Sequence, residues 1–561
     1  MTKRKTPPTG KRPQAPPAAK PSIAPPIVLP PWLWWVGLAI ILLVYAYFRY
    51  QFILTPLERD EGSYGYIGQL ILDGKRPYLD FYEMKPPALF YSYALLVGVF
   101  GASLEGLHLA VLTLYLLNAL MLFLIARNLF GRPSALLAPL SYLSLALASL
   151  ASGYTAQAEH ITTFYLIAGY YFASRGYASG GKKWEWVLAG AFLATAFMTK
   201  QIAALMALPV LLILAGWVYN QPTPRRSAWL AAARNTGWMA LGGVVVVAGW
   251  LAVVAAQGGW NDMLFWVLEY PKKYASKFTW EDRKPTFIAI FNAMWREYLV
   301  LWLLALAGLA LGLISRRYRI MALFSAAVLG TALISVFPGY YFYSHYWLFL
   351  APAAALCAAL FAGALTERLS SAWPSAPAGI VAVLMLFVVF LWDFGKRKTY
   401  YTSPNIKQIM RVAYADNPFP ETLEIAKELK KRSAPGDELL VMGSEPQLNF
   451  YTGMRSPTRH FFMGFLAKYH PEETAWIAEA KADAERSKPR FLVHVVHPFS
   501  WAYPNSSKTE MFDFGFAFAS KYYKTIGMVE LSPEGSQYYW DEAALQHPRS
   551  KDKFIQIFER R

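Results

Sequence analysis

Long apolar runs, separated by short polar linkers, make up most of this chain. Crossing a bilayer takes about 20 apolar residues in a helix, and about eleven runs approach that length. They lie at 31–48, 107–126, 134–151, 158–174, 184–199, 202–219, 237–256, 298–314, 320–337, 345–364 and 377–394. The pattern predicts an α-helical multi-pass membrane protein.

A further apolar run at 86–101 is shorter, starts with two prolines and contains Gly98 and Gly101. If this run does not cross the membrane, all the basic linkers fall on the cytoplasmic side, as the positive-inside rule requires. Those linkers are 127–132, 175–183, 225–234 and 316–319. We therefore predict that 86–101 forms a helix along the outer membrane surface.

This topology divides the chain into three parts. Residues 1–30 are basic and rich in proline, which predicts a disordered cytosolic tail. Residues 31–394 are predicted to form the membrane domain, with 49–106 and 257–297 on the outer face. Residues 395–561 are predicted to form a small soluble α/β domain on that same face.

The α/β prediction for the last part depends on two alternating patterns. Helix-like runs occur at 421–431 and 472–485, and strand-like runs occur at 438–442, 491–496 and 525–531.

Composition excludes an ordinary soluble protein, because 55% of residues are hydrophobic and only 16% are charged, against about 25% in soluble domains. The formal net charge is +18. Its basic residues sit in linkers and not on one amphipathic face, so the charge indicates membrane topology and no nucleic-acid partner. The single cysteine, Cys357, excludes an intramolecular disulfide.

The first outer segment concentrates acids beside the membrane, with Asp60 and Glu61 adjacent to each other. A carboxylate held at such an interface is a candidate general base for group transfer to a hydroxyl. The alternative is that the two acids cap a helix over 62–72. Lys85, at the start of the surface helix, is a candidate phosphate ligand.

Other ionisable residues lie where spans meet the outer face. Glu159 enters an apolar run, which is costly unless the residue has a function. Lys200 opposes the charge bias, as expected of a residue that faces an anionic donor, although a snorkelling lysine is the alternative. His345 and Tyr346 precede a span, where an aromatic belt explains them equally well.

Three motifs of the first outer segment resemble bacterial GT-C glycosyltransferases, the protein O-mannosyltransferase-like enzymes. They are Asp60-Glu61-Gly62-x-Tyr64, Gly74-x-x-Pro77-Tyr78-x-Asp80 and Lys85-Pro86-Pro87. The similarity covers residues 31 to about 394 and includes Arg127-Asn128-Leu129-Phe130-Gly131-Arg132, Glu159, Met198-Thr199-Lys200, His345-Tyr346 and Ala351-Pro352. Within the superfamily the chain looks closest to the RgtA/B/C/D-like group, and more distantly like the lipid A aminoarabinose transferase.

The resemblance implies transfer of a sugar from a polyprenyl-phosphate donor to an acceptor hydroxyl, with inversion, on the periplasmic face of the bacterial inner membrane. The acceptor would be an envelope glycan, lipid or protein.

The resemblance also implies roles for single residues. Asp60 would be the general base with Glu61 as its neighbour. Lys85 would contact the donor phosphate, and Glu159 would be an acid opposite that site. Lys272 and Lys273 fall where related enzymes place a basic residue near the phosphate. The remaining substrate-site candidates are Tyr64, Tyr78, Asp80, Glu83, His345 and Tyr346.

The aminoarabinose transferase resemblance also raises a metal site, formed by an acid beside the lysine and a histidine in the later loop. Here Met84 stands beside Lys85, and the later loop has no histidine. Glu83 near Asp60 would suit Mg²⁺ or Mn²⁺ better than zinc. We assign no metal from the sequence.

Two other functional classes predict different patterns. A transporter or flippase of lipid-linked sugars predicts ionisable residues within the spans and an internal repeat, and neither is clear in this chain. A non-enzymatic assembly partner would not explain why Asp60, Glu61 and Lys85 occur together.

Overall fold

The computed structural model describes residues 30–221, 224–372, 378–467, 472–501, 509–532, 534–548 and 553–561. Of the predicted disordered tail at 1–30, all but Pro30 lies outside the described residues.

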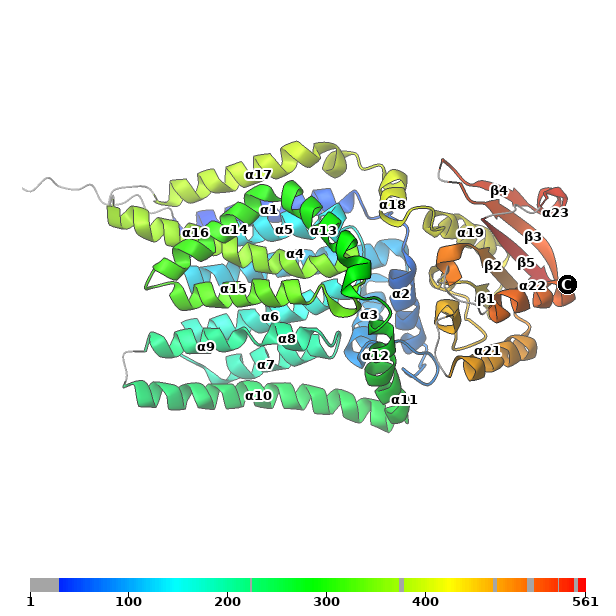
Figure 1. Ribbon diagram of the computed structural model, residues 1–561, viewed down its shortest axis with the longest axis horizontal. Helices are drawn as coiled ribbons and strands as arrows, with labels where there is room; N and C mark the ends of the chain where they lie inside the picture. The colour runs from blue at the N-terminus through cyan, green and yellow to red at the C-terminus, as the bar shows by residue number, and fades with distance from the viewer. Residues whose placement is uncertain are drawn as a thin grey trace, which may run out of the picture.

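A bundle of roughly aligned apolar helices forms the larger part of the molecule (Figure 1). These helices are α1 (Pro31–Tyr50), α4 (Leu104–Phe130), α5 (Leu137–Ala146), α6 (Ala158–Ala178), α7 (Lys183–Phe197), α8 (Ala203–Ala207), α9 (Val210–Tyr219), α10 (Arg225–Ala256), α14 (Leu299–Ile314), α15 (Arg319–Ile334), α16 (Leu350–Ala372) and α17 (Ala378–Thr402). The bundle confirms the prediction of a membrane-type helical protein.

Among the described residues, four helices are long and apolar enough to cross a membrane, or five if a bent pair counts as one span. The four are 31–50, 104–130, 226–256 and 344–371, and the pair is α13 (Trp280–Glu297) with α14, bent by 87°. The runs at 134–151, 202–219 and 320–337 contain shorter apolar helices. The runs at 158–174, 184–199 and 377–394 correspond to α6, α7 and α17. The prediction of about eleven crossings therefore remains a prediction.

Several helices run across one end of the bundle instead of along it (Figure 1). They include α2 (Arg59–Leu72), α3 (Pro87–Phe100), α11 (Trp260–Leu264) and α12 (Tyr270–Ala275). A five-residue π-helical turn, η3 (Phe265–Glu269), joins the last two. The segment 86–101 thus forms a helix, as the sequence predicts, and this helix runs across one end of the bundle. Its position on the outer membrane surface stays a prediction.

Residues after α17 form a separate layer of sheet and helices beyond that end (Figure 1). Its helices are α18 (Ile406–Tyr414), α19 (Phe419–Arg432), α20 (Gln447–Thr452), α21 (Glu473–Ser487), α22 (Glu510–Tyr522) and α23 (Glu542–Gln546). Its strands are β1 (Leu439–Met442), β2 (Phe491–Val496), β3 (Tyr523–Glu530), β4 (Gln537–Trp540) and β5 (Phe554–Arg560). We call residues 403–561 the C-terminal region.

The five strands form one sheet in the order β1-β2-β5-β3-β4. β1 and β2 are parallel, and the other neighbours are antiparallel. Three strands and two helices of this region match the predicted runs, whereas β4 and β5 were not predicted. The chain's last strand, β5, lies at the centre of the sheet, between β2 and β3.

Short helical turns complete the fold. They are η1 (Arg132–Ser134), η2 (Ser149–Ala151), η4 (Pro338–Tyr340), η5 (Ser344–Phe349), η6 (Met463–Ala467) and η7 (Pro498–Trp501). Of these, η5, η6 and η7 contribute residues to the wall of the candidate site.

Candidate active site

The predicted acids of the first outer segment lie in the first turn of α2. The Glu58 carboxylate accepts a hydrogen bond from the backbone N–H of Glu61 at 2.9 Å, and the Glu61 carboxylate accepts one from the backbone N–H of Glu58 at 3.0 Å. This capping box pairs two of the backbone donors that a helix start leaves free. The capping alternative therefore describes Glu61, with Glu58 as its partner, while Asp60 takes no part in it.

A cavity of 720 Å³ lies beside this first turn. Its wall combines the start of α2, the segment before α3, the start of α6, the 274–283 segment, η5 with the residues before it, and part of the C-terminal region. The residues expected from the sequence that line it are Asp60, Tyr64, Glu83, Lys85, Glu159, Lys200, His345 and Tyr346. Folding thus brings the first outer segment, Glu159, Lys200 and the His345–Tyr346 pair together around one cavity.

Glu159, at the start of α6, forms the centre of an ionic cluster in the cavity wall. Its carboxylate pairs with the Lys200 ammonium, and the His345 Nε2 atom lies 3.9 Å from the same oxygen. The Lys200 Nζ atom also lies 4.3 Å from the centre of the Tyr346 ring. Glu159 is only 1% exposed, so the buried carboxylate depends on these partners and on the helix N-terminus for its charge.

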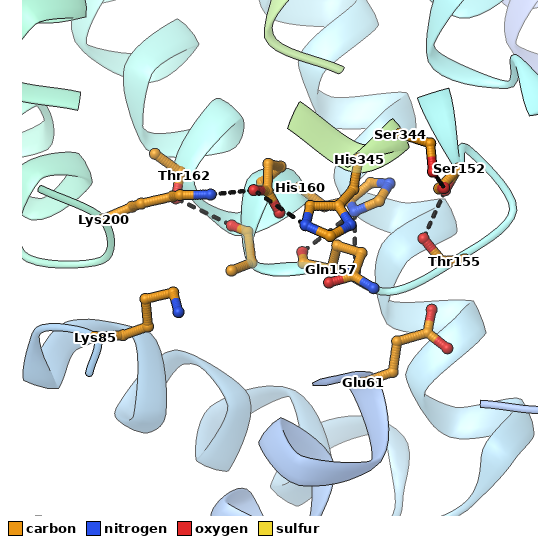
Figure 2. A network of polar contacts seen from close by, with 12 residues as sticks. Glu61, Lys85, Ser152, Thr155, Gln157, His160, Thr162, Lys200, Ser344 and His345 are labelled. Carbon is orange, nitrogen blue, oxygen red and sulfur yellow. Dashed lines mark hydrogen bonds and ion pairs between the residues drawn. The ribbon is translucent and has the colours of Figure 1, made fainter. Parts of the chain in front are cut away.

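The loop that carries Lys200 is fixed by a buried hydrogen bond of 3.0 Å between the hydroxyls of Thr199 and Thr162. Figure 2 shows Lys200 and His345 reaching one contact network from different segments, with Lys85 on another segment and joined to that network by no dashed line.

Lys85 is held by its own chain neighbours. Its Nζ atom lies 3.3 Å from the Glu83 carboxylate, which also accepts a hydrogen bond from the Lys85 backbone N–H at 3.1 Å. The Tyr78 hydroxyl donates to the Lys85 carbonyl at 2.8 Å. Tyr78 is fully buried. It contacts the backbone of Lys85 but does not line the cavity.

Asp60 differs from the other acids of the cavity wall. Glu58, Glu83 and Glu159 each hold a side-chain hydrogen bond or an ion pair with a neighbour. Within the described part of the chain, the Asp60 side chain has neither. A carboxylate in this situation is ready to accept a proton from a bound molecule.

Glu61 does not line the cavity. It is completely buried and accepts a short hydrogen bond from the backbone N–H of Ala156. Burial raises the pKa of Glu61 to about 7, against the effect of the hydrogen bonds from Ala156 and Glu58. Burial and the neighbouring acids also raise the pKa of Glu58, whose carboxylate accepts a hydrogen bond from the Gln157 amide at 2.5 Å.

Besides Tyr78 and Glu61, three further expected site residues lie away from the cavity. Lys272 and Lys273 are exposed on α12, and Lys272 pairs with Glu269 at 2.8 Å. Asp80 pairs with Arg76 at 3.2 Å in a surface turn. None of the three contributes to the cavity wall.

Two other basic residues of the 257–297 segment line the cavity, namely Lys277 and Arg283. Arg283 donates hydrogen bonds to the carbonyls of Tyr340 and Tyr341, at 3.3 and 2.8 Å, and so fixes the loop before η5. The sequence places all these basic residues in one polar stretch. Lys277 lies in the turn between α12 and α13 and Arg283 lies on α13, and these two face the cavity.

The C-terminal region supplies another wall of the cavity, which the sequence did not predict residue by residue. Its lining residues include Asn417, Ser444, Phe462, Phe465 and Phe499. Arg59, next to Asp60, also lines the cavity and reaches this wall.

Among the described residues, no group of three or more His, Cys, Asp or Glu side chains is arranged to hold a metal ion. Glu83, the acid considered for a metal site with Asp60, pairs with Lys85. We therefore derive no step through a metal.

Comparison with known sequences gives two partial matches. Residues 84–251 match a family described as dolichyl-phosphate-mannose-protein mannosyltransferase. The chain is also 30% identical over 244 residues to the undecaprenyl phosphate-alpha-4-amino-4-deoxy-L-arabinose arabinosyl transferase of Pseudomonas aeruginosa (strain UCBPP-PA14). That match covers 40% of this chain and 42% of the relative, so it spans less than half of the relative's length.

Solved structures match over nearly the whole chain. ArnT from Cupriavidus metallidurans, bound to undecaprenyl phosphate, gives a TM-score of 0.59 at 14% identity and covers 94% of this chain and 98% of its own. This chain has the ArnT fold. The archaeal oligosaccharyltransferase AglB from Archaeoglobus fulgidus, in complex with an inhibitory peptide and a dolichol-phosphate, gives 0.50 at 13% identity, covering 92% and 75%. The predicted resemblance to GT-C glycosyltransferases, and distantly to the aminoarabinose transferase, is thereby confirmed; the RgtA/B/C/D-like assignment stays a prediction.

Proposed function

We propose that this protein is an inverting glycosyltransferase of the bacterial inner membrane. It transfers a sugar from a polyprenyl-phosphate donor to a hydroxyl group of an envelope lipid, glycan or protein. The N-terminus lies in the cytoplasm, and the cavity and the C-terminal region lie on the periplasmic face.

The main support for the proposal is the Asp60 carboxylate, which lines the cavity without a partner among the described residues. It shares the cavity with the cationic side chains of Lys85 and Lys200. A free base and fixed cations in one cavity are what transfer from a phosphate-linked donor requires.

In the proposed step, Asp60 accepts the proton of the acceptor hydroxyl as its oxygen attacks the anomeric carbon of the donor sugar. The bond between that carbon and the phosphate oxygen breaks on the opposite face, and its electron pair stays on the polyprenyl phosphate. A single displacement of this kind inverts the anomeric configuration. Asp60 is regenerated when its proton passes to water.

Cations of the cavity wall stabilise the negative charge that develops on the departing phosphate. Lys85 and Lys200 are each paired with an acid, which keeps them ordered before the donor binds. Lys277 and Arg283 line the same cavity and take the role near the phosphate that was predicted for Lys272 and Lys273. Glu159 acts by holding Lys200 in place.

The lipid carriers in the related structures support the donor class. ArnT was solved with undecaprenyl phosphate and AglB with a dolichol-phosphate, so their shared fold accommodates a polyprenyl phosphate. The flippase alternative has no comparable support.

The test is sugar transfer by the purified protein in lipid nanodiscs, from synthetic polyprenyl-phosphate sugars that carry a radiolabel. We expect Asp60→Asn to lower the rate by roughly 10²- to 10⁴-fold, the usual contribution of a general base. The matched control is Asp73→Asn, the same change at the other end of α2, where the side chain is exposed and outside the cavity. This control should retain full activity.

Equal rates for the Asp60 variant and the native protein would exclude Asp60 as the base. Movement of intact lipid-linked sugar across the bilayer without transfer would exclude the glycosyltransferase assignment and support the flippase.

A further inference from the structure

The helix that carries Asp60 is attached to the C-terminal region through the preceding residue. The Arg59 guanidinium donates a hydrogen bond to the Asn417 side-chain oxygen at 2.9 Å. It also lies 3.9 Å from the Glu445 carboxylate and 5.5 Å from the centre of the Phe419 ring. Three contacts from one side chain thus span the boundary between the first outer segment and the C-terminal region.

Glu445 is enclosed on its side of this boundary. Its side chain has no exposed surface, and one carboxylate oxygen accepts a short hydrogen bond from the Ser500 hydroxyl. Within the described residues, Arg59 is its only ion-pair partner. Burial raises the pKa of Glu445, and the nearby Arg59 guanidinium opposes that rise. The hydrogen bond to Asn417 and this contact with Glu445 together favour one position of the Arg59 guanidinium.

The backbone of α2 is held against the same region one turn further on. A methyl group at Gly62 would lie 2.6 Å from the Gln447 Cα atom and 2.7 Å from its backbone nitrogen. Just before the helix, the Leu57 N–H donates to the Tyr451 hydroxyl at 2.6 Å. Backbone contact on both sides of Asp60 therefore restricts the first turn of α2.

Asp60 lies between these attachments, yet its own carboxylate has no partner among the described residues. The direction in which it enters the cavity is therefore determined by its helix and not by bonds of its own. We infer that Arg59 and Glu445 are positioning residues that hold the general base at the angle required for transfer. This inference rests on the proposed function, and it gives the C-terminal region a part in catalysis.

A second ion pair across the same boundary provides a matched control. Arg455 of the C-terminal region lies 3.1 Å from Asp73, which follows the last residue of α2. Both of its side chains are about half exposed, at 53% and 45%. This pair also links α2 to the C-terminal region, but at the end of the helix far from Asp60.

The test compares the steady-state kinetics of Arg59→Gln, Arg59→Lys, Glu445→Gln, Arg59→Gln with Glu445→Gln, and Arg455→Gln in the full chain. Misplacement of a reacting group by about 1 Å lowers rates by up to roughly 10²-fold. We expect Arg59→Gln to lower kcat about 10- to 100-fold while the KM for the donor changes less than about twofold. Arg59→Lys should recover part of kcat because it keeps the charge.

If the two residues act as one unit, the double variant will be no slower than Arg59→Gln alone. Arg455→Gln should keep the native kcat. Thermal unfolding of every variant separates loss of folded protein from loss of turnover.

Three outcomes would overturn the inference: an unchanged kcat in folded Arg59→Gln, a raised donor KM with normal kcat, or fully additive effects of the two substitutions. A raised KM would make Arg59 a donor ligand instead. A native protein that transfers no sugar would contradict the proposed function itself, and the two failures are thereby distinguished.

Discussion

Four neighbouring residues at the start of α2 have different roles because their surroundings differ. Glu58 and Glu61 are buried and form the capping box, and Arg59 contacts the C-terminal region. Asp60 lines the cavity and has no hydrogen-bond or ion-pair partner among the described residues. Three of the four are acids of similar intrinsic strength. Burial and hydrogen bonding, more than residue type, therefore determine which acid is available for proton transfer.

Glu61 makes stability depend on pH in a direction that can be checked. Its pKa rises from 4.5 to about 7 on folding, chiefly through burial, so the folded protein holds a proton there that the unfolded chain releases. The stabilisation is complete below pH 4.5 and is lost as pH rises toward 7, with a slope of at most about 1.4 kcal/mol per pH unit for one group.

Thermal unfolding of the native protein and of Glu61→Gln, measured between pH 5 and 8, checks this prediction. We expect the native protein to lose stability relative to the variant as pH rises, because the glutamine cannot ionise. Glu281→Gln, an exposed site on α13, is the control. Parallel curves for Glu61→Gln and the native protein would show that Glu61 does not titrate in this range.

At the scale of elements, α2 is notable for its glycines at 62, 65 and 68. A side chain at any of them would meet another segment: Gln447 at Gly62, Leu107 and Phe450 at Gly65, and Tyr93 at Gly68. Glycine is unfavourable within a helix. Its repeated use here is explained by neighbouring segments that pack too closely to leave room for a side chain. α2 is enclosed between α3 and α4 of the membrane domain and α20 of the C-terminal region.

This packing predicts that Gly62→Ala destabilises the protein and lowers transfer, whereas Gly98→Ala on α3 does neither. The new methyl group at Gly62 meets backbone atoms at less than 3 Å, whereas that at Gly98 meets only the Leu72 side chain, at 3.7 Å. Overpacking of this kind costs about 1–3 kcal/mol, and alanine in an open helix position gains about 0.5–1 kcal/mol. Chemical denaturation and initial rates of both variants test the contrast, and equal behaviour of the two would contradict it.

Elements were predicted well where their signal is local. The helix over 62–72, the surface helix at 86–101 and the strand-like runs at 438–442 and 491–496 all have counterparts in the structure. β5 was missed although it occupies the centre of the sheet, because its place there depends on pairing with β2 and β3, far away in the chain. A short stretch of sequence carries little information about pairing between strands that are far apart in the chain.

The whole molecule places the cavity at one end of the bundle, between the helices that cross it and the C-terminal region (Figure 1). The start of α10, which contains Arg225 and Arg226, and the linker between α14 and α15, which contains Arg316 and Arg317, lie at the other end (Figure 1). This separation fits the positive-inside rule if the cavity faces the periplasm.

Single cysteines test that orientation directly. In a Cys357→Ala background, Leu545→Cys on exposed α23 should react with an impermeant maleimide in intact spheroplasts, whereas Ala178→Cys at the exposed end of α6 should react only after permeabilisation. The physical reason is the charge bias of the linkers, which keeps 175–183 in the cytoplasm. Labelling in the reverse pattern would invert the proposed topology and place the cavity inside the cell.

Some properties of the protein follow from its sequence because they depend on short stretches of chain. Apolar run length and linker charge predicted the membrane fold and its orientation, and the motifs at Asp60, Lys85 and Glu159 indicated the region of the site. Other properties depend on where distant side chains meet. Packing determined that Asp60 and not Glu61 enters the cavity, that Lys277 and Arg283 line it in place of Lys272 and Lys273, and that the C-terminal region forms part of its wall. No local pattern encodes these outcomes, because each is decided by contacts between segments far apart in the chain.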